Sequence, residues 1–270
     1  MKNNNNDKKI IKSNRLTYLV DFILVGIISC FMYYNFIKIS EQENYIYSEI
    51  NSKKIKIERS KLAANSEKPN NSSALLNGVD VSHYQGEVQW QQVADTYHFA
   101  FIKATEGTNY IDPRFQENIN NIENTSMKYG AYHFFNPALD AIEQAKHFIN
   151  TIAHENLSLP SVLDIEIEPI GSNQSLQASV KDWLVYVEKA TGCRPIIYTN
   201  KHYWLTYLAD HFTDYPLWIG DYTTSDNRMV SIPWAFWQYT DKGKVTGING
   251  IVDKSHFDGN AVKLNKFSCI

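Results

Sequence analysis

Residues 161–169 read Ser161-Val162-Leu163-Asp164-Ile165-Glu166-Ile167-Glu168-Pro169 and alternate between apolar and acidic side chains. This alternation predicts a short strand, and because successive side chains of a strand point to opposite faces, the three acids share one face. Carboxylates so close together repel one another, and burial without partners would destabilise them. The stretch alone leaves two interpretations open. It is either a solvated acidic strand, or a strand whose charges contact a substrate, a metal or a basic partner.

Strand and helix patterns alternate from residue 78 onward. Eight segments have the composition of strands, at residues 78–82, 99–104, 130–135, 162–166, 195–198, 217–220, 235–239 and 250–253. Apolar residues recur at helical spacing in 142–153 and 176–187, and Gly192 is placed to end the second helix. The alternation predicts a parallel sheet of the α/β class. About eight strands in roughly 190 residues predict an incomplete (β/α) barrel, since the connections after Gly220 are too short or irregular for full helices.

The composition indicates which kinds of ligand or partner the protein is expected to bind. The 270-residue chain is 43% hydrophobic and 20% charged, as expected of a globular protein, and its net charge is -3. It has no basic patch interleaved with aromatic residues, so we expect no nucleic-acid partner. The three cysteines form no disulfide framework and no metal-ligand spacing, and we expect neither a metal site nor a cofactor. Pairing of Cys193 with Cys269 stays open.

The N-terminal part has the pattern of a membrane anchor. Residues 1–15 are basic and polar, and residues 16–37 form an apolar run in which Asp21 is the only charge. About 20 such residues span a bilayer as a helix, and the basic residues before the run place the N-terminus in the cytoplasm. Residues 38–77 resemble a polar stalk and linker, which leaves 78–270 as the barrel domain. We therefore expect a single-pass protein with its barrel outside the cytoplasm. Lipoprotein processing at Cys30 is an alternative tether.

The residues that follow the predicted strands are mostly acidic or aromatic. In a parallel barrel, the carboxyl ends of the strands form one face, and catalytic residues collect there. The candidates at these ends are Asp80, Glu106, Tyr132, Asp164, Glu166, Tyr198, Trp218, Trp237 and Asp253. So many acids and aromatic rings at one face predict a ligand cleft.

The same strand ends carry a family resemblance. Five motifs occur in order: Gly78-Val79-Asp80-Val81-Ser82 with Gln85-Gly86 and Trp90, then Lys103-Ala104-Thr105-Glu106-Gly107, Gly130-Ala131-Tyr132-His133-Phe134, Asp164-Ile165-Glu166 and Trp237-Gln238-Tyr239. Together they resemble the glycoside hydrolase family 25 lysozymes over residues 78–259. The resemblance implies a barrel enzyme that cleaves the β-1,4 bond between N-acetylmuramic acid and N-acetylglucosamine, with peptidoglycan glycan strands as its partner. Two departures concern fine contacts: Gly220 stands where the family usually has Ala, and Lys254 and Ser255 are less apolar than the usual pattern.

Roles follow from matching these motifs. Glycosidic cleavage needs an acid for the leaving oxygen and a group that stabilises the developing positive charge. Glu166 matches the family's catalytic acid, and Asp164 on the same face would keep Glu166 protonated by like-charge repulsion. The resemblance also implies that Asp164 orients the substrate's 2-acetamido group as an internal nucleophile. Retention of configuration is an implication of the resemblance and not of residue spacing. Glu168 is interpreted as a rim charge.

The remaining candidates would bind substrate. Asp80 and Asp253 match two further acids of the family cleft, with a loop-capping role as the alternative. Four aromatic residues are candidates for sugar stacking, with core packing as the alternative for each: Tyr132, Tyr198, Trp218 and Trp237. Two other functions stay open. One is a catalytically silent, membrane-tethered module that binds peptidoglycan in the same cleft, and the other is a barrel glycosidase that acts on chitin-like polymers.

Overall fold

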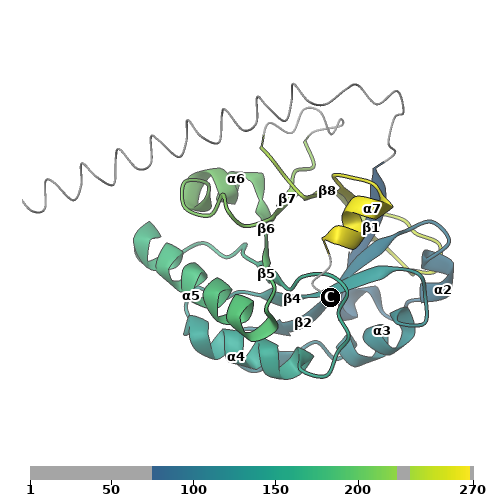
Figure 1. Cartoon of the computed structure of the whole chain (residues 1–270), viewed down its shortest axis with the longest axis horizontal. Helices are drawn as coiled ribbons and strands as arrows, with labels where there is room; N and C mark the ends of the chain where they lie inside the picture. Colours follow the sequence, from purple (N-terminus) through teal and green to yellow (C-terminus); the bar gives the residue numbers. More distant parts are fainter. Residues whose placement is uncertain (1–74, 224–231, 268–270) are drawn as a thin grey trace, which may run out of the picture. The chain divides into compact units, whose positions relative to one another are not determined.

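A single sheet forms the centre of the protein (Figure 1). The computed structural model describes residues 75–223 and 232–267, and within them nine strands pair in the order β1-β9-β8-β7-β6-β5-β4-β2-β3. The strands are β1 (Leu76–Val81), β2 (Phe99–Glu106), β3 (Tyr110–Ile111), β4 (Lys128–Phe134), β5 (Val162–Asp164), β6 (Ile196–Asn200), β7 (Leu217–Gly220), β8 (Phe236–Gly243) and β9 (Val252–Phe257). Because β1 also pairs with β2, all strands but β3 close into a barrel. The eight predicted strands are confirmed.

Helices cover only part of the barrel, as expected of an incomplete (β/α) barrel. The helical elements are η1 (His83–Gln85), α2 (Trp90–Val93), α3 (Phe115–Ile122), α4 (Ala141–Ile152), α5 (Asn173–Thr191), α6 (Lys201–Tyr203), η2 (Trp204–Leu208) and α7 (Ala261–Lys266). α3, α4 and α5 form an arc beside the strands (Figure 1). The two helices predicted from apolar spacing are α4 and α5, and α5 ends at Gly192 in the left-handed conformation at φ 69°.

The last strand departs from the predicted parallel sheet. Each pairing from β1 through β2 and β4 to β8 is parallel, but β9 runs antiparallel to both of its neighbours, β8 and β1. Only residues 244–251 separate β8 from β9, and a parallel crossover needs about a dozen residues or more. The reversal has a consequence for the site. Asp253 at the start of β9 reaches the same end of the barrel as the carboxyl ends of the other strands, and it is paired in register with Asp80.

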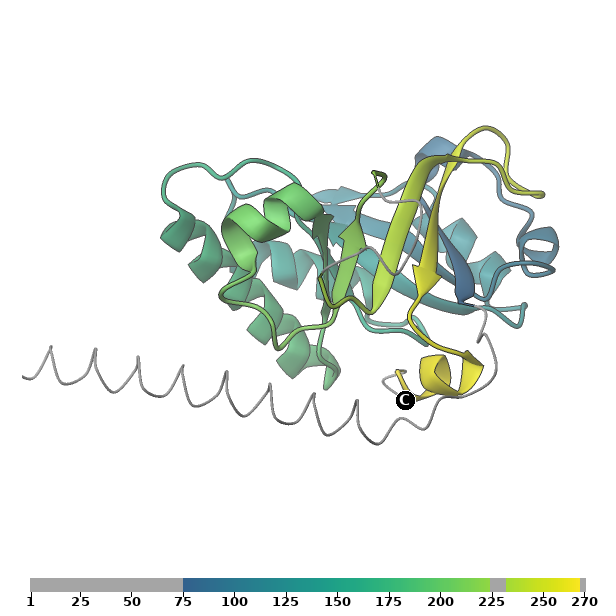
Figure 2. The same cartoon turned by 90° about the horizontal axis from the view of Figure 1, so that it is seen from above.

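Two apolar layers fix which side chains face inward. The barrel interior is filled by Leu76, Phe99, Phe101, Leu159, Val162, Ile196, Tyr198, Trp218, Phe236, Phe257 and Leu264. Alternate strand residues such as Leu163 and Ile197 pack outward against helix residues such as Trp183. α7 lies at the end of the barrel opposite the carboxyl ends of the parallel strands, where Leu264 joins the interior cluster (Figure 2). With that end filled, the opposite end is the one open to a ligand.

Several predictions concern residues outside the described ranges. The basic segment 1–15, the apolar run 16–37, Cys30 and Cys269 all lie there, as does the linker up to residue 74. The strand β1 begins at Leu76, so the end of the predicted linker is already part of the barrel. Among residues 75–223 and 232–267, no helix is both long and apolar enough to cross a bilayer. Cys193 takes part in a disulfide.

Candidate active site

A cavity of about 210 Å³ opens at the carboxyl ends of the parallel strands. Its lining comes from strands of the barrel and from the turn after β1: Asp80, Val81, Ser82, Tyr84, Gln85, Lys103, Tyr132, Phe134, Asp164, Glu166, Tyr198, Trp218, Gln238 and Asp253. Seven of the eight residues that the sequence singled out as catalytic or substrate-binding are in this set. The structure therefore brings seven of the predicted strand-end residues together around one cavity.

One pair of acids is bridged by an amide. Gln238 on β8 donates from Nε2 to both carboxyl oxygens of Asp80, at 3.1 Å and 3.0 Å, and to Asp253 Oδ2 at 3.5 Å. Its own Oε1 accepts hydrogen bonds from the hydroxyls of Tyr198, at 2.7 Å, and Tyr222. Burial, followed by the nearby Asp253, raises the pKa of Asp80 well above its usual range. The pair is held in place by folded neighbours before any ligand arrives.

The second pair comes from the opening stretch. Asp164 is the last residue of β5 and shares the inward side with Val162, while Glu166 lies just beyond the strand end instead of within it as predicted. Asp164 is buried, and its Oδ1 has no hydrogen-bond partner among the described residues. A buried carboxyl oxygen without a partner is costly, so its persistence indicates a place where a ligand donates.

The two carboxyls of this pair both hold protons more tightly than usual. Burial, and then the neighbouring Glu166, raises the pKa of Asp164 well above its usual range, whereas Lys103 lowers it. Glu166 is exposed as a whole residue, yet burial on its cavity side is the main cause that raises its pKa. Two such neighbouring carboxyls can share a proton, so that one member acts as an acid while the other stays ionised.

Three of the four predicted stacking residues line the cavity. Tyr198 and Trp218 lie side by side with ring centroids 4.5 Å apart, and Trp218 Nε1 donates to Ser255 Oγ at 3.1 Å. Tyr132, on β4, is the third. Trp237 is not brought into the cavity. It packs outward with the helix-facing layer, and its Nε1 donates to the backbone oxygen of Asp221 at 2.9 Å. Side chains alternate along β8, so Gln238 points inward instead.

Seven of the lining residues were not assigned a role from the sequence, and two of them stand out by their contacts and charge. Gln238 joins the acids of β1 and β9, and Lys103 is the one cationic side chain among the described residues that line the cavity. Strand parity was the available signal for Gln238, because Phe236, two residues before it, has the apolar character of an interior position. Lys103 offered no such signal, since a lysine within an apolar strand is compatible with either face.

Paired carboxyls with raised pKa values, set among aromatic rings at the open end of a barrel, are suited to acid catalysis on a carbohydrate. They define the class of glycoside hydrolases that work with two carboxyl groups. The cavity has acids enough for a proton donor, a charge-stabilising partner and a further substrate-holding pair.

The comparisons with known proteins agree with this class. Residues 79–248 match the family model described as "Glycosyl hydrolases family 25". Lysozyme M1 of Streptomyces globisporus is 36% identical over 205 residues, which cover 70% of each chain. The uncharacterized protein YegX of Escherichia coli strain K12 is 39% identical over 201 residues, which cover 72% of this chain and 74% of YegX. The chain belongs to glycosyl hydrolase family 25.

Solved structures support the same assignment. A bacterial lysozyme from Streptomyces coelicolor superposes with a TM-score of 0.66 at 34% identity, over 73% of this chain and 99% of that one. A family 25 glycosyl hydrolase from Bacillus anthracis also gives a TM-score of 0.66, at 32% identity, over 71% of this chain and 93% of that one. The protein is therefore a glycoside hydrolase with the barrel of this family.

Proposed function

We propose that the protein is a muramidase that hydrolyses the β-1,4 bond between N-acetylmuramic acid and N-acetylglucosamine in peptidoglycan, with net retention of configuration. The observation that carries the proposal is the buried Asp164 Oδ1, which lies in the cavity beside Glu166 and has no hydrogen-bond partner within residues 75–223 and 232–267. The amide N–H of an N-acetyl sugar can donate a hydrogen bond to this oxygen. Family membership and lysozyme relatives such as that of Streptomyces globisporus support the choice of substrate.

In this mechanism the two carboxyls have different tasks. Glu166 donates its proton to the glycosidic oxygen, and the bond from that oxygen to C1 breaks. Asp164 accepts the N–H of the 2-acetamido group, and the acetamido carbonyl oxygen attacks C1 from the opposite face. Glu166, now a carboxylate, removes a proton from the water that opens the cyclic intermediate. The incoming oxygen ends on the face from which the leaving group departed.

The other lining residues would hold the sugar. The Asp80–Gln238–Asp253 group presents oriented polar atoms for hydroxyl groups or for the attacking water. Tyr132, Tyr198 and Trp218 present aromatic faces on which a pyranose ring can stack. Trp237, which packs away from the cavity, has no part in this assignment.

The test uses residues 73–270, which form one compact unit. Purified peptidoglycan is incubated with this protein, reduced with borohydride and analysed by mass spectrometry. A muramidase leaves reduced muramic acid at the new ends, whereas a glucosaminidase leaves reduced glucosamine. Chitin oligosaccharides are tested in parallel, and their cleavage would indicate a chitin-directed glycosidase instead of a muramidase.

The variant Glu166→Gln keeps the shape of the side chain and removes the acid. We expect release of muropeptides to fall by about a thousandfold, in the range that general acid catalysis contributes. The exposed Glu143→Gln on α4 serves as the matched control and should leave the rate unchanged. If the wild-type protein binds peptidoglycan but produces no new reducing ends, the protein is a binding module and the proposed enzyme function is wrong.

We also propose that the hydrolase domain is tethered outside the cytoplasm by residues 16–37, with residues 1–15 inside and a stalk from residue 38 up to the start of β1 at Leu76. The apolar run and the basic residues before it support this arrangement. Carbonate extraction of membranes from cells that express the full chain should leave the protein in the pellet. Recovery of a soluble mature form that lacks residues 1–35 would contradict the anchor. Labelling with a fatty-acid analogue, lost in Cys30→Ser, would instead favour lipoprotein processing.

A further inference from the structure

Lys103 is a buried cation placed between two cavities. It lies on β2, with its side chain 9% exposed, and lines the catalytic cavity together with Asp164. It also lines an adjoining cavity of about 490 Å³, whose wall includes His83, Tyr110 and Asn136. Among the described residues that line the catalytic cavity, it is the only cation beside four acids.

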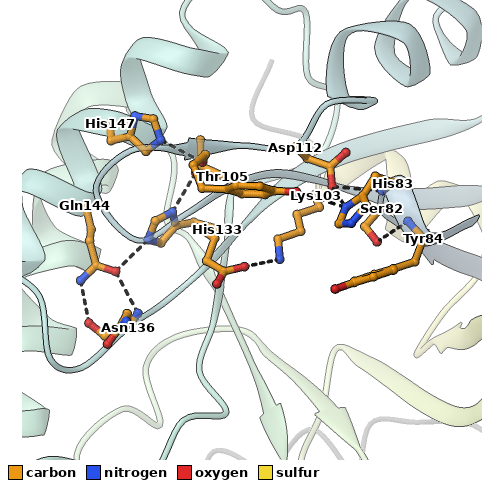
Figure 3. Close-up of polar contacts among 12 residues, drawn as sticks. Ser82, His83, Tyr84, Lys103, Thr105, Asp112, His133, Asn136, Gln144 and His147 are labelled. Carbon is orange, nitrogen blue, oxygen red and sulfur yellow. Dashed lines mark hydrogen bonds and ion pairs between the residues drawn. The ribbon is translucent and has the colours of Figure 1, made fainter. Parts of the chain in front are cut away.

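Its ammonium group is held from several sides. Nζ lies 2.7 Å from Oε2 of Glu106, which is the last residue of the same strand. Figure 3 labels Lys103 and draws a dashed line from its ammonium nitrogen to a carboxylate oxygen. Nζ also lies 4.8 Å from the ring centroid of Phe134 and 5.7 Å from that of Tyr110. The faces of aromatic rings attract a cation, so these contacts restrain the charge at the border of the cavity. A restrained charge in a poorly solvated place acts more strongly on its neighbours than a mobile surface lysine.

The groups around Asp164 otherwise disfavour its ionised form. Glu166 on the same segment and Asp80 on β1 are acidic, and burial acts in the same direction. The phenols of Tyr132 on β4 and Tyr198 on β6 also face the carboxyl, and both have raised pKa values and stay neutral. Lys103 alone opposes these effects, and its positive charge lowers the pKa of Asp164. His133, on the same strand as Tyr132, is buried in the outer layer with its pKa lowered to about 3, so it adds no competing charge.

We propose that Lys103 is a positioning residue of the reaction: its ammonium group, fixed at the border of the cavity, favours the carboxylate form of Asp164, which is the form that accepts a hydrogen bond from the substrate N–H. This inference rests on the proposed function, in which the two carboxyls have opposite protonation states. Glu106 also influences the pKa of Asp164, because its negative charge partly neutralises Lys103 while it holds the ammonium group in place.

The experiment compares kcat/KM from pH 3 to 9 for the wild type, Lys103→Met, Lys103→Arg and Glu106→Gln. The acid limb of this profile reports the group that must be ionised in the free enzyme. Without the lysine charge Asp164 ionises only at higher pH, so Lys103→Met should move the acid limb upward by about one pH unit or more. Lys103→Arg keeps the charge and should restore the wild-type limb. Glu106→Gln leaves Lys103 without a counter-charge and should move the limb downward.

A matched control is available on α4. Lys146 and Glu143 form another i,i+3 ion pair, at 2.8 Å, but both side chains are exposed and away from the cavity. Lys146→Met should leave the pH profile unchanged. A uniform loss of rate at every pH in Lys103→Met, with no movement of the acid limb, would assign Lys103 a purely structural role and overturn the proposal.

A direct titration keeps the test independent of the proposed function. Carbon-13 NMR of aspartate carboxyl groups, with Asp164 assigned from the spectrum of Asp164→Asn, follows its ionisation in the free protein. The midpoint should rise in Lys103→Met and fall in Glu106→Gln. An unchanged midpoint in both variants overturns the inference whether or not the protein cleaves peptidoglycan. Absence of cleavage together with midpoints that move as expected would instead refute the proposed function alone.

Discussion

The two pairs of acids in the cavity differ in how folding satisfies their oxygens. Asp80 receives two hydrogen bonds from Gln238, which also reaches Asp253, whereas Asp164 keeps a buried oxygen without a partner among the described residues. The first pair is complete in the free protein. The second stays incomplete until something donates to it. The difference separates a pair that the fold stabilises from a pair that a ligand stabilises, although both lie in one cavity.

The largest effect that follows from this difference concerns Asp164→Asn. The amide keeps the shape but cannot hold the charge that orients the acetamido group, so we expect kcat to fall by about a hundredfold. Folding should not suffer. Among the described residues Asp164 Oδ1 has no hydrogen-bond partner to lose, so the free energy of unfolding should stay the same or rise by about 1 kcal/mol. Rates of muropeptide release and urea unfolding at pH 7 measure the two quantities.

Asp80→Asn is the matched variant for that comparison. One carboxyl oxygen becomes an NH₂ group that faces the donating Nε2 of Gln238, so this variant should lose stability while Asp164→Asn does not. Equal destabilisation by both variants would mean that the two pairs do not differ in the way described.

The next effect concerns the bridge itself. Gln238→Leu removes the donors to Asp80 and the acceptor for the Tyr198 hydroxyl, and it leaves buried polar groups on both sides short of a partner. We expect the free energy of unfolding to fall by about 2 kcal/mol, and the melting temperature to fall by about 6 °C for a domain of this size. The exposed Gln116→Leu on α3 is the control. An unchanged melting temperature would show that the bridge contributes nothing to folding.

A smaller effect is the dependence of stability on pH. Burial raises the pKa values of Asp80, Asp164, Glu166 and Asp253 above those of the unfolded chain. The folded state therefore binds more protons than the unfolded state in the range that begins near the ordinary carboxyl pKa of 3.8 and extends upward. Stability falls as pH rises through that range, with a slope of about 1.4 kcal/mol per pH unit for each carboxyl that is protonated only in the folded state.

Urea unfolding at intervals from pH 4 to 8 measures this slope. Asp164→Asn and Asp80→Asn should each flatten it, because each removes one group with a raised pKa. A wild-type protein whose stability rises with pH over the same interval would contradict the raised pKa values of these carboxyls.

Much of this arrangement could be predicted from the sequence, because the apolar residues of its strands and helices recur at regular spacing. Alternating strands and helices predicted the barrel, and acids at strand ends predicted the cleft. The pair Asp164 and Glu166 followed from their shared face and from the family motif. The structure confirms the barrel and places both residues in the cavity, while their catalytic roles remain predictions.

What the sequence did not predict depends on contacts distant along the chain. The reversal of β9 arises because its connection is too short for a crossover, and Asp253 then pairs with a residue far away in sequence. Trp237 was assigned to the cavity by its aromatic character, but strand parity turns it outward and turns Gln238 inward. The position of the Lys103 charge depends on its ion pair with Glu106 and on the two aromatic rings around it.

The smallest effect tests how closely the bridged pair is packed. Gly220 stands where family members usually have Ala, and a Cβ added there would lie 3.3 Å from the Tyr198 hydroxyl and 3.6 Å from Gln238 Oε1. Its φ is not positive, so Ala is allowed by the backbone and should lower the entropy of the unfolded chain. We expect Gly220→Ala to change the free energy of unfolding by about 0.5 kcal/mol or less, as the gain in unfolded-state entropy offsets the tighter contact. Any effect on catalysis should appear in KM and not in kcat, because the added methyl group touches the bridged pair and leaves Asp164 and Glu166 free. A fall in kcat with unchanged KM would show that the two pairs are coupled through Tyr198, which adjoins both.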